Sequence, residues 1–308
     1  MLQTRVIFLF LIILLPSLLL AGTQFGTDFW GWLIAGLLIA VAGVMLVAFL
    51  LVWLMFLLAL RAPDGQRARL TRVQRWSLLC REWLAALRLY GGSQLFAWPR
   101  NKVDKASGGK QSAIVVLVHG YFCNTGFFSA FARRLRSSGW QTIRLHMLFG
   151  YNRVDAAAAR LRDELHRIRH RYPGRPIVLV GHSMGGVASV SALCRYDLPI
   201  TGAVVVGAPL HGTLFGQWRL LGAPGGWRQP GIGEICRIES DQRLPIERLQ
   251  CVFSWHDNIV VPQSSARLQG VDEAPLQRVG HLEMAFSRVA HDAIIRSMEH
   301  LVDKGLRQ

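Results

Sequence analysis

A serine framed by glycines is the first feature of this sequence that could do chemistry. The segment GHSMG, residues 181–185, follows an aliphatic stretch that begins at Pro176, and helix-compatible residues come after it. This is the pattern of a nucleophile elbow, a sharp strand-turn-helix connection that exposes a serine hydroxyl at its tip. Glycines are needed there because the turn brings neighbouring backbone too close to accept a Cβ atom. We therefore predict that Ser183 is a nucleophile; the alternative is an ordinary glycine-rich turn.

A serine nucleophile needs a general base, which is most often a histidine that a carboxylate orients. After a nucleophile elbow the acid and then the histidine follow in the chain, each at the C-terminal end of a strand. Asp257 directly follows a predicted strand over 249–255, and His281 follows a short predicted strand over 277–280. We predict that Asp257 is the acid and His281 is the base. The alternatives for the acid are Glu239 and Asp241.

Acyl transfer also requires hydrogen-bond donors for the oxyanion of the tetrahedral intermediate. One donor in such sites is the backbone N–H of the residue after the nucleophile, which is Met184 here. The other comes from the loop after an early strand, and residues 119–122 occupy that place. We predict the N–H of Tyr121 as the second donor, with that of Phe122 as the alternative. The side chain of His119 is expected to be structural.

The chain from Ala113 onward alternates strand and helix patterns, which must position these residues. Alternation with strands that are apolar throughout is typical of a parallel sheet covered by helices on both faces. Residues 210–249, rich in Gly, Trp and Pro, interrupt the alternation of strands and helices. We predict that they form a lid over the acyl pocket; the alternative is a long, partly helical surface loop. The remaining predicted strands cover 113–119, 140–147, 177–181 and 200–206, and the predicted helices cover 126–138, 154–172, 184–196 and 283–302.

Together these motifs resemble the bacterial lipase and esterase branch of the α/β-hydrolases. The resemblance covers about residues 113–304 and includes VHG at 118–120, GAPLHGT at 207–213, DNIVVP at 257–262 and GHL at 280–282, besides the elbow. It implies a doubly wound, mostly parallel sheet and hydrolysis of carboxylic esters through an acyl-enzyme, without a redox or organic cofactor. Some lipases of this group bind calcium near the acid and base. No paired carboxylates surround Asp257, so we predict no metal.

The N-terminal part of the chain lies outside that resemblance and carries two apolar segments. Residues 6–21 are either a first transmembrane helix or a cleaved signal peptide. Residues 29–60 form an unbroken apolar run, longer than a bilayer core requires, with tryptophans near both ends. We predict that this second segment spans a membrane and that the first does so too if it is retained.

Positive charge gives the predicted orientation. Six arginines follow the second apolar segment, and the connection between the two segments has no positive residue. Because such residues stay on the cytoplasmic side, we predict an inner (plasma) membrane protein with a cytoplasmic catalytic domain. The net charge of +16 fits attraction to anionic lipids better than nucleic-acid binding, since no nucleic-acid motif is present. The six arginines that follow the second apolar segment are Arg61, Arg67, Arg69, Arg72, Arg75 and Arg81.

Residues 69–90 are predicted to form an amphipathic helix. Its apolar stripe suits either the headgroup region of a membrane or packing against the catalytic domain, and the periodicity leaves both open. Residues 99–112 are expected to be a polar linker. The predicted divisions are thus a membrane anchor over 1–60, a basic helix and linker over 61–112, and a catalytic domain over 113–308. The stripe consists of Leu70, Val73, Trp76, Leu79, Trp83, Leu84 and Leu87.

These observations predict a membrane-anchored serine hydrolase that cleaves lipid or other acyl esters. Two alternatives stay open: an acyltransferase or thioesterase that uses the same triad, and a non-catalytic membrane-bound scaffold. Acyl-chain length, head group and oligomeric state are not determined. Five cysteines without a C-x-x-C pair favour free thiols in a reducing compartment. They are Cys80, Cys123, Cys194, Cys236 and Cys251.

Overall fold

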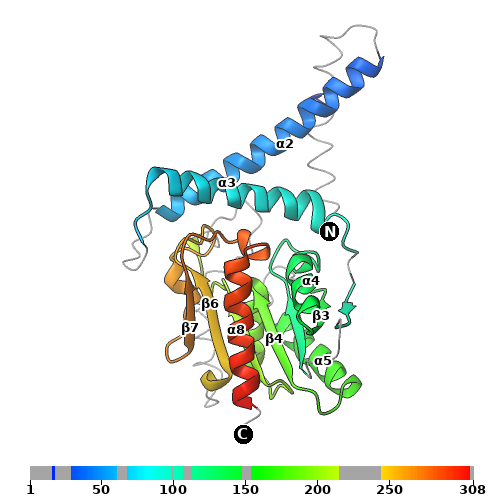
Figure 1. The fold of residues 1–308 in the computed structure, drawn as a ribbon, viewed down its shortest axis with the longest axis vertical. Coiled ribbons are helices and arrows are strands. Elements are labelled where there is room, and N and C mark those ends of the chain that lie inside the picture. The colour runs from blue at the N-terminus through cyan, green and yellow to red at the C-terminus, as the bar shows by residue number, and fades with distance from the viewer. Residues whose placement is uncertain are drawn as a thin grey trace.

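A seven-stranded sheet forms the centre of the fold in the computed structural model (Figure 1). The structure describes residues 16–17, 29–60, 68–98, 100–106, 113–147, 154–214 and 244–305. The strand order is β1-β3-β2-β4-β5-β6-β7, and every pair is parallel except β1 with β3. The strands are β1 (Lys102–Asp104), β2 (Ile114–Val118), β3 (Gln141–Leu145), β4 (Ile177–His182), β5 (Gly202–Val206), β6 (Leu249–Ser254) and β7 (Asp272–Leu276).

The three central strands are aliphatic because both of their faces are covered. Every residue of β2, β4 and β5 is buried, as expected for a parallel sheet between two helical layers. In their registers Val118 pairs with Gly181, and His182 pairs with Val206. The C-terminal ends of these strands therefore lie side by side at one edge of the sheet, which is where doubly wound folds place their sites.

Helices cover the two faces of the sheet and build two separate cores. The helices α4 (Ser129–Ser137) and α8 (Arg288–Gly305) pack on one face, in a cluster that includes Val115 and Val180. The helices α5 (Val154–Arg171) and α6 (Met184–Arg195) pack on the other face, with Ile114 and Leu179. The predicted doubly wound, mostly parallel α/β sheet is confirmed.

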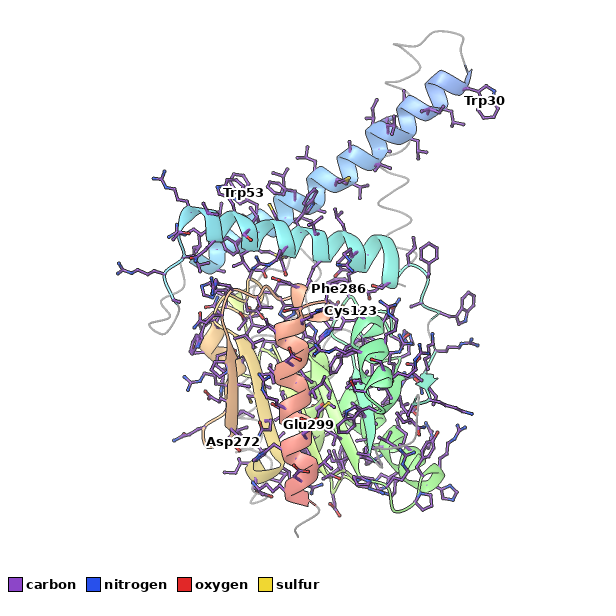
Figure 2. The ribbon with its side chains drawn as sticks, viewed as in Figure 1. Trp30, Trp53, Cys123, Asp272, Phe286 and Glu299 are labelled. Atoms are coloured by element: carbon purple, nitrogen blue, oxygen red, sulfur yellow. The ribbon has the colours of Figure 1, made fainter. Side chains whose placement is uncertain are left out.

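Two further helices lie at the end of the domain where the central strands terminate. Figure 1 shows α3 (Arg72–Arg88) across that end and α2 (Phe29–Leu60) running away from the domain beyond it. The residues Leu33–Leu60 of α2 have a mean hydropathy of 2.9, so the helix is long and apolar enough to cross a bilayer. Trp30 lies at its far end and Trp53 near α3 (Figure 2). The first apolar segment, residues 6–21, falls outside the described residues apart from 16–17.

The last turns of α2 pack against the rest of the molecule. Val52 and Phe56 are buried in the core cluster that α3 and α8 share, and Ala59 is buried against Val261. Trp83 of α3 donates a hydrogen bond from Nε1 to the carbonyl of Met45, at 3.1 Å. The long apolar helix is therefore joined to the domain through side-chain packing as well as through the chain.

The last strand of the sheet is not the one that the sequence predicted. We predicted residues 277–280, whereas β7 is Asp272–Leu276. An edge strand of a sheet tolerates exposed charge and proline, and β7 contains Pro275, so its sequence lacks the apolar pattern of a buried strand. The predicted stretch turns instead, because Arg278 has a φ of 60°, which is incompatible with an extended strand.

Two other boundaries differ from the prediction. Residues 102–104, expected to lie in a linker, pair antiparallel with β3 as the edge strand β1. Asp104 accepts a hydrogen bond at 2.9 Å from Nε of the buried Arg144, a contact between chain segments that periodicity does not reveal. The closing helix α8 starts at Arg288, and residues 283–285 form a separate 3₁₀ turn, η7 (Glu283–Ala285).

The face of α3 that packs on the domain also differs from the predicted stripe. Val73, Trp76 and Leu84 are exposed. The buried residues of the helix are Leu78, Leu79, Glu82, Ala85 and Ala86. The reason is that α3 carries apolar side chains on more than one side, and the domain accepts the side with the small residues. One side of the helix therefore packs on the domain, whereas its contact with the headgroup region of a membrane stays a prediction.

Among the cysteines in the described part of the chain, one departs from the prediction of free thiols. Cys80, Cys123 and Cys251 are free, whereas Cys194 is disulfide-bonded. Sequence spacing did not indicate this bond because no motif marks it. The predicted lid falls largely on residues 215–243, which lie outside the described part of the chain, as do Glu239 and Asp241.

Candidate active site

Ser183 lies at the strained tip between β4 and α6. Its backbone has φ 53° and ψ −122°, a conformation that non-glycine residues rarely adopt. Its N–H donates to the carbonyl of Val206 at 2.9 Å, which fixes the tip against β5. A Cβ at Gly185 would lie 2.2 Å from the Val118 carbonyl oxygen, so only glycine fits there. The strand-turn-helix geometry of a nucleophile elbow is therefore present.

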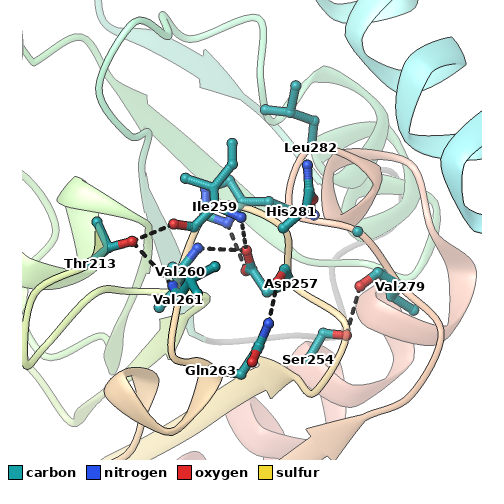
Figure 3. A network of polar contacts seen from close by, with 12 residues as sticks. Thr213, Ser254, Asp257, Ile259, Val260, Val261, Gln263, Val279, His281 and Leu282 are labelled. Atoms are coloured by element: carbon teal, nitrogen blue, oxygen red, sulfur yellow. Dashed lines mark hydrogen bonds and ion pairs between the residues drawn. The ribbon is translucent and has the colours of Figure 1, made fainter. Parts of the chain in front are cut away.

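Asp257 and His281 are joined by a short hydrogen bond. His281 Nδ1 donates to Asp257 Oδ2 at 2.7 Å, and the two side chains are 3% and 2% exposed. The other carboxylate oxygen, Oδ1, accepts from the N–H groups of Ile259 and Val260, each at 2.8 Å (Figure 3). These two backbone donors hold the carboxylate in one orientation. The ring of His281 consequently keeps its proton on Nδ1 when it is neutral, and Nε2 is the nitrogen that can accept one.

The pKa of His281 is raised above its ordinary value despite complete burial. Burial lowers the pKa, but the charge of Asp257, its hydrogen bond to Nδ1 and the charge of Glu82 together outweigh that effect. Two other buried histidines behave differently. Burial lowers the pKa of His119 to about 4 and holds that of His182 well below its ordinary value. Among these three rings, His281 is the one whose surroundings favour taking up a proton.

The serine and the histidine occupy neighbouring positions at the same edge of the sheet. His182, which precedes Ser183, has its ring 4.6 Å from that of His281 between centroids. A Cβ at Gly207, just after β5, would lie 3.4 Å from Asp257 Oδ2. Within the described residues no hydrogen bond joins the Ser183 hydroxyl to the His281 ring, a contact that often tightens only when substrate is bound.

The loop after β2 lies against Ser183. A Cβ at Gly120 would be 2.8 Å from Ser183 Cβ and 3.3 Å from its Oγ, so this glycine permits the close approach. Of the predicted oxyanion donors, Tyr121 follows Gly120 in the chain, and Met184 follows Ser183 and begins α6. Phe122, the alternative donor, has a φ of 57°, so the loop turns sharply there. Gly120, which precedes Tyr121, thus lies against Ser183, and the role of the Tyr121 and Met184 N–H groups stays a prediction.

The contacts of His119 agree with the structural role predicted for it. Its Nε2 accepts from the N–H of Met147 at 3.1 Å, and its Nδ1 donates to the carbonyl of Gly120 at 2.9 Å. A ring that uses both nitrogens in this way is a neutral spacer between β2 and β3. It fixes the loop that carries Tyr121, one of the two predicted oxyanion donors.

Several residues around the acid and base were missed from the sequence. Asn258 Oδ1 accepts from the N–H of His281 at 3.1 Å. Gln263 Nε2 donates to the Asp257 carbonyl at 2.7 Å (Figure 3). Glu82 of α3 accepts from two N–H groups next to His281. The DNIVVP segment gave a signal for Asn258, but nothing local marks Glu82, which lies 200 residues before its partner.

The fold is that of the α/β-hydrolases. A family model described as serine aminopeptidase, S33, matches residues 109–221. The comparison with curated proteins gave no match.

Solved structures give the same fold. The Bacillus licheniformis lipase BlEst2 in its mature form is 14% identical, with a TM-score of 0.54, over 67% of this chain and 99% of that one. Its propeptide form is 15% identical, with a TM-score of 0.52, over 61% of this chain. This chain spans about half, 51%, of the length of the propeptide form. At such identities the likeness concerns the fold alone.

Proposed function

We propose that this protein is a serine hydrolase that cleaves carboxylic esters through an acyl-enzyme. The observation that carries the proposal is the hydrogen bond of 2.7 Å between Asp257 and His281, beside a serine held in a strained elbow. A nucleophile, a base with a raised pKa and an orienting acid are the groups that acyl transfer needs. The family match and the lipase neighbours support the same class of chemistry.

The reaction proceeds in two halves with the same groups. Ser183 Oγ attacks the ester carbonyl while its proton passes to His281 Nε2, and the oxyanion is held by the N–H groups of Tyr121 and Met184. The C–O bond of the ester breaks, and the alcohol leaves with the proton from His281. Water then attacks the acyl-enzyme and gives a proton to His281. That proton returns to Ser183 Oγ as the carboxylic acid departs, and Asp257 stabilises the imidazolium throughout.

Lipid esters are the substrate class that the position of the site favours. The active-site edge of the sheet is the edge that α3 crosses, and α2 packs against the loop that contains Val261. If α2 spans a bilayer, this edge faces the membrane surface. Exposed Val73 and Trp76 on α3, followed by exposed Phe96 and Trp98, add apolar groups on that side.

The test of the proposed activity is turnover of p-nitrophenyl esters by the detergent-solubilised full chain, across a series of acyl-chain lengths. We expect hydrolysis that follows saturation kinetics and covalent labelling by a fluorophosphonate probe. An added alcohol or thiol acceptor shows whether the acyl group goes to water or to the acceptor, which separates a hydrolase from an acyltransferase. Folded protein that neither turns over an ester nor takes up the probe would contradict the proposal and favour a scaffold.

We further propose that α2 anchors the protein in the plasma membrane with the catalytic domain in the cytoplasm. The helix has the length and hydropathy of a span, and the cluster of arginines that follows it supports this orientation. The disulfide at Cys194 points the other way, because stable disulfides form in oxidising compartments. The orientation is therefore the part of the proposal that a direct experiment must decide.

In a bacterial host the full chain is expected to remain in the membrane fraction after carbonate extraction, because an apolar span is not released by high pH. A reporter fused at the C-terminus that is active only in the periplasm is expected to be silent. A cytoplasmic fluorescent reporter at the same position serves as the matched control. Release of the chain by carbonate would rule out the anchor, and an active periplasmic reporter would reverse the orientation.

A further inference from the structure

Glu82 of α3 reaches the loop that carries His281. Its side chain is buried, with the residue 1% exposed. Oε1 accepts from the N–H of Leu282 and Oε2 from that of Glu283, each at 2.8 Å. On the other side of the histidine, a Cβ at Gly280 would lie 2.2 Å from Oε2. The carboxylate therefore contacts the residues that flank His281 both before and after it.

A buried carboxylate is costly unless hydrogen bonds compensate for the lost water. Here the two compensating donors are backbone N–H groups of the His281 loop. The Glu82 carboxylate of α3 is in turn the acceptor for those two N–H groups. The conformation of the loop thus depends on a side chain from outside the hydrolase domain.

The rest of α3 is attached at the same place. Arg81 donates from Nε to Glu283 Oε1 and from Nη2 to the carbonyl of Arg278, both at 2.8 Å. Just before the helix, the carbonyl of Ala68 contacts Nε2 of His256 at 3.1 Å. At Trp83 the helix contacts α2 through a ring contact with Phe49, 5.7 Å between centroids. A continuous set of contacts therefore runs from the long apolar helix to the loop of the catalytic histidine.

We propose that Glu82 is a positioning residue for His281: it fixes the loop over residues 280–283 and so makes the active site depend on the docking of α3. This inference rests on the proposed function, since it assigns His281 the part of the general base. It goes further in naming a residue of the membrane-proximal helix that the reaction requires. Glu82 does not touch substrate; it acts through His281.

The charge of Glu82 gives this arrangement a pH signature. Burial raises the pKa of Glu82 to about 7, against the opposing effect of its two backbone hydrogen bonds. The charged Glu82 in turn helps to raise the pKa of His281. Besides His281, the titratable groups coupled to the carboxylate are Asp257 and Tyr90, which Glu82→Gln leaves in place. At and above pH of about 7, where Glu82 is charged, removing that charge is expected to lower the pKa of His281.

The test compares Glu82→Gln with the wild-type full chain in detergent. Glutamine keeps one acceptor oxygen for the loop and loses the charge and the second acceptor. We expect kcat to fall about 10- to 100-fold, the size of the loss when an outer hydrogen-bond partner of a metal-bound histidine is removed, with KM for a short ester little changed. The acid limb of the kcat/KM profile is expected to move to lower pH. Cys80→Ser, at an exposed position of the same helix, should match the wild type.

A second readout needs no substrate. The pKa of His281 is measured by NMR on histidine-labelled protein, with the signal assigned by its loss in His281→Gln. We expect a lower pKa in Glu82→Gln than in the wild type or Cys80→Ser. Wild-type kcat and an unmoved His281 pKa in a folded Glu82→Gln protein would overturn the inference. An inactive wild type would instead contradict the proposed function, and the histidine titration would still decide whether Glu82 acts on His281.

Discussion

Replacing Ser183 by alanine is expected to lower kcat for ester hydrolysis by about 10⁴- to 10⁶-fold and to abolish labelling by a fluorophosphonate. The physical reason is that the proposed acyl-enzyme forms on the Ser183 hydroxyl, which alanine lacks. A residual rate above that of water should persist, because the oxyanion donors and the binding surface remain. The measurement is single-substrate kinetics with p-nitrophenyl butyrate, together with intact-mass detection of the labelled protein. Alanine is chosen because it removes the hydroxyl of Ser183 and leaves the backbone unchanged.

Ser191→Ala is the matched control for that experiment. Ser191 lies in the same helix α6, is buried, and its hydroxyl has no hydrogen-bond partner among the described residues. Removing an unpaired buried hydroxyl is expected to leave folding and kcat close to those of the wild type. If Ser183→Ala kept the turnover and the labelling of Ser191→Ala, the elbow would not carry the nucleophile.

Replacing Asp257 by asparagine should lower kcat by about 10³- to 10⁴-fold at neutral pH. Ile259 and Val260 donate to Oδ1, so the amide oxygen of asparagine takes that position. The amide NH₂ then faces His281 and can only donate, which forces the ring proton from Nδ1 to Nε2. A histidine protonated on Nε2 cannot accept the proton of Ser183. The fold should be intact, because the two backbone hydrogen bonds are kept.

The same substitution should change the pH dependence in a defined direction. The Asp257 carboxylate raises the pKa of His281, so its loss leaves the lowering effect of burial less opposed. The acid limb of kcat/KM is therefore expected to move to lower pH while the plateau falls. Asp197→Asn, an exposed carboxylate just after α6, is the control and should retain the wild-type profile. A plateau within about threefold of the wild type would show that another group orients the histidine.

The sequence determined those parts of the molecule that depend on neighbouring residues. The apolar strands and the helices that follow them were predicted because burial on both faces requires an unbroken aliphatic run. The nucleophile elbow was predicted because the glycines that its tight turn requires are next to the serine in the sequence. Asp257 was selected because it follows a buried strand directly. The long apolar helix α2 was predicted in the same way, because its length and hydropathy can be read from the sequence without knowing what it contacts.

Only the tertiary structure decided which residues from distant segments meet. The edge strands β1 and β7 were not predicted, because a strand at the edge of a sheet can be exposed and then needs no apolar sequence pattern. Periodicity could not choose the packed side of α3, since the domain accepts the face with Ala85 and Ala86 while Val73 and Trp76 stay exposed. Glu82 looked like one charged residue of a basic helix. It became a neighbour of His281 only when α3 crossed the end of the sheet, because a contact over 200 residues of chain leaves no trace in local spacing.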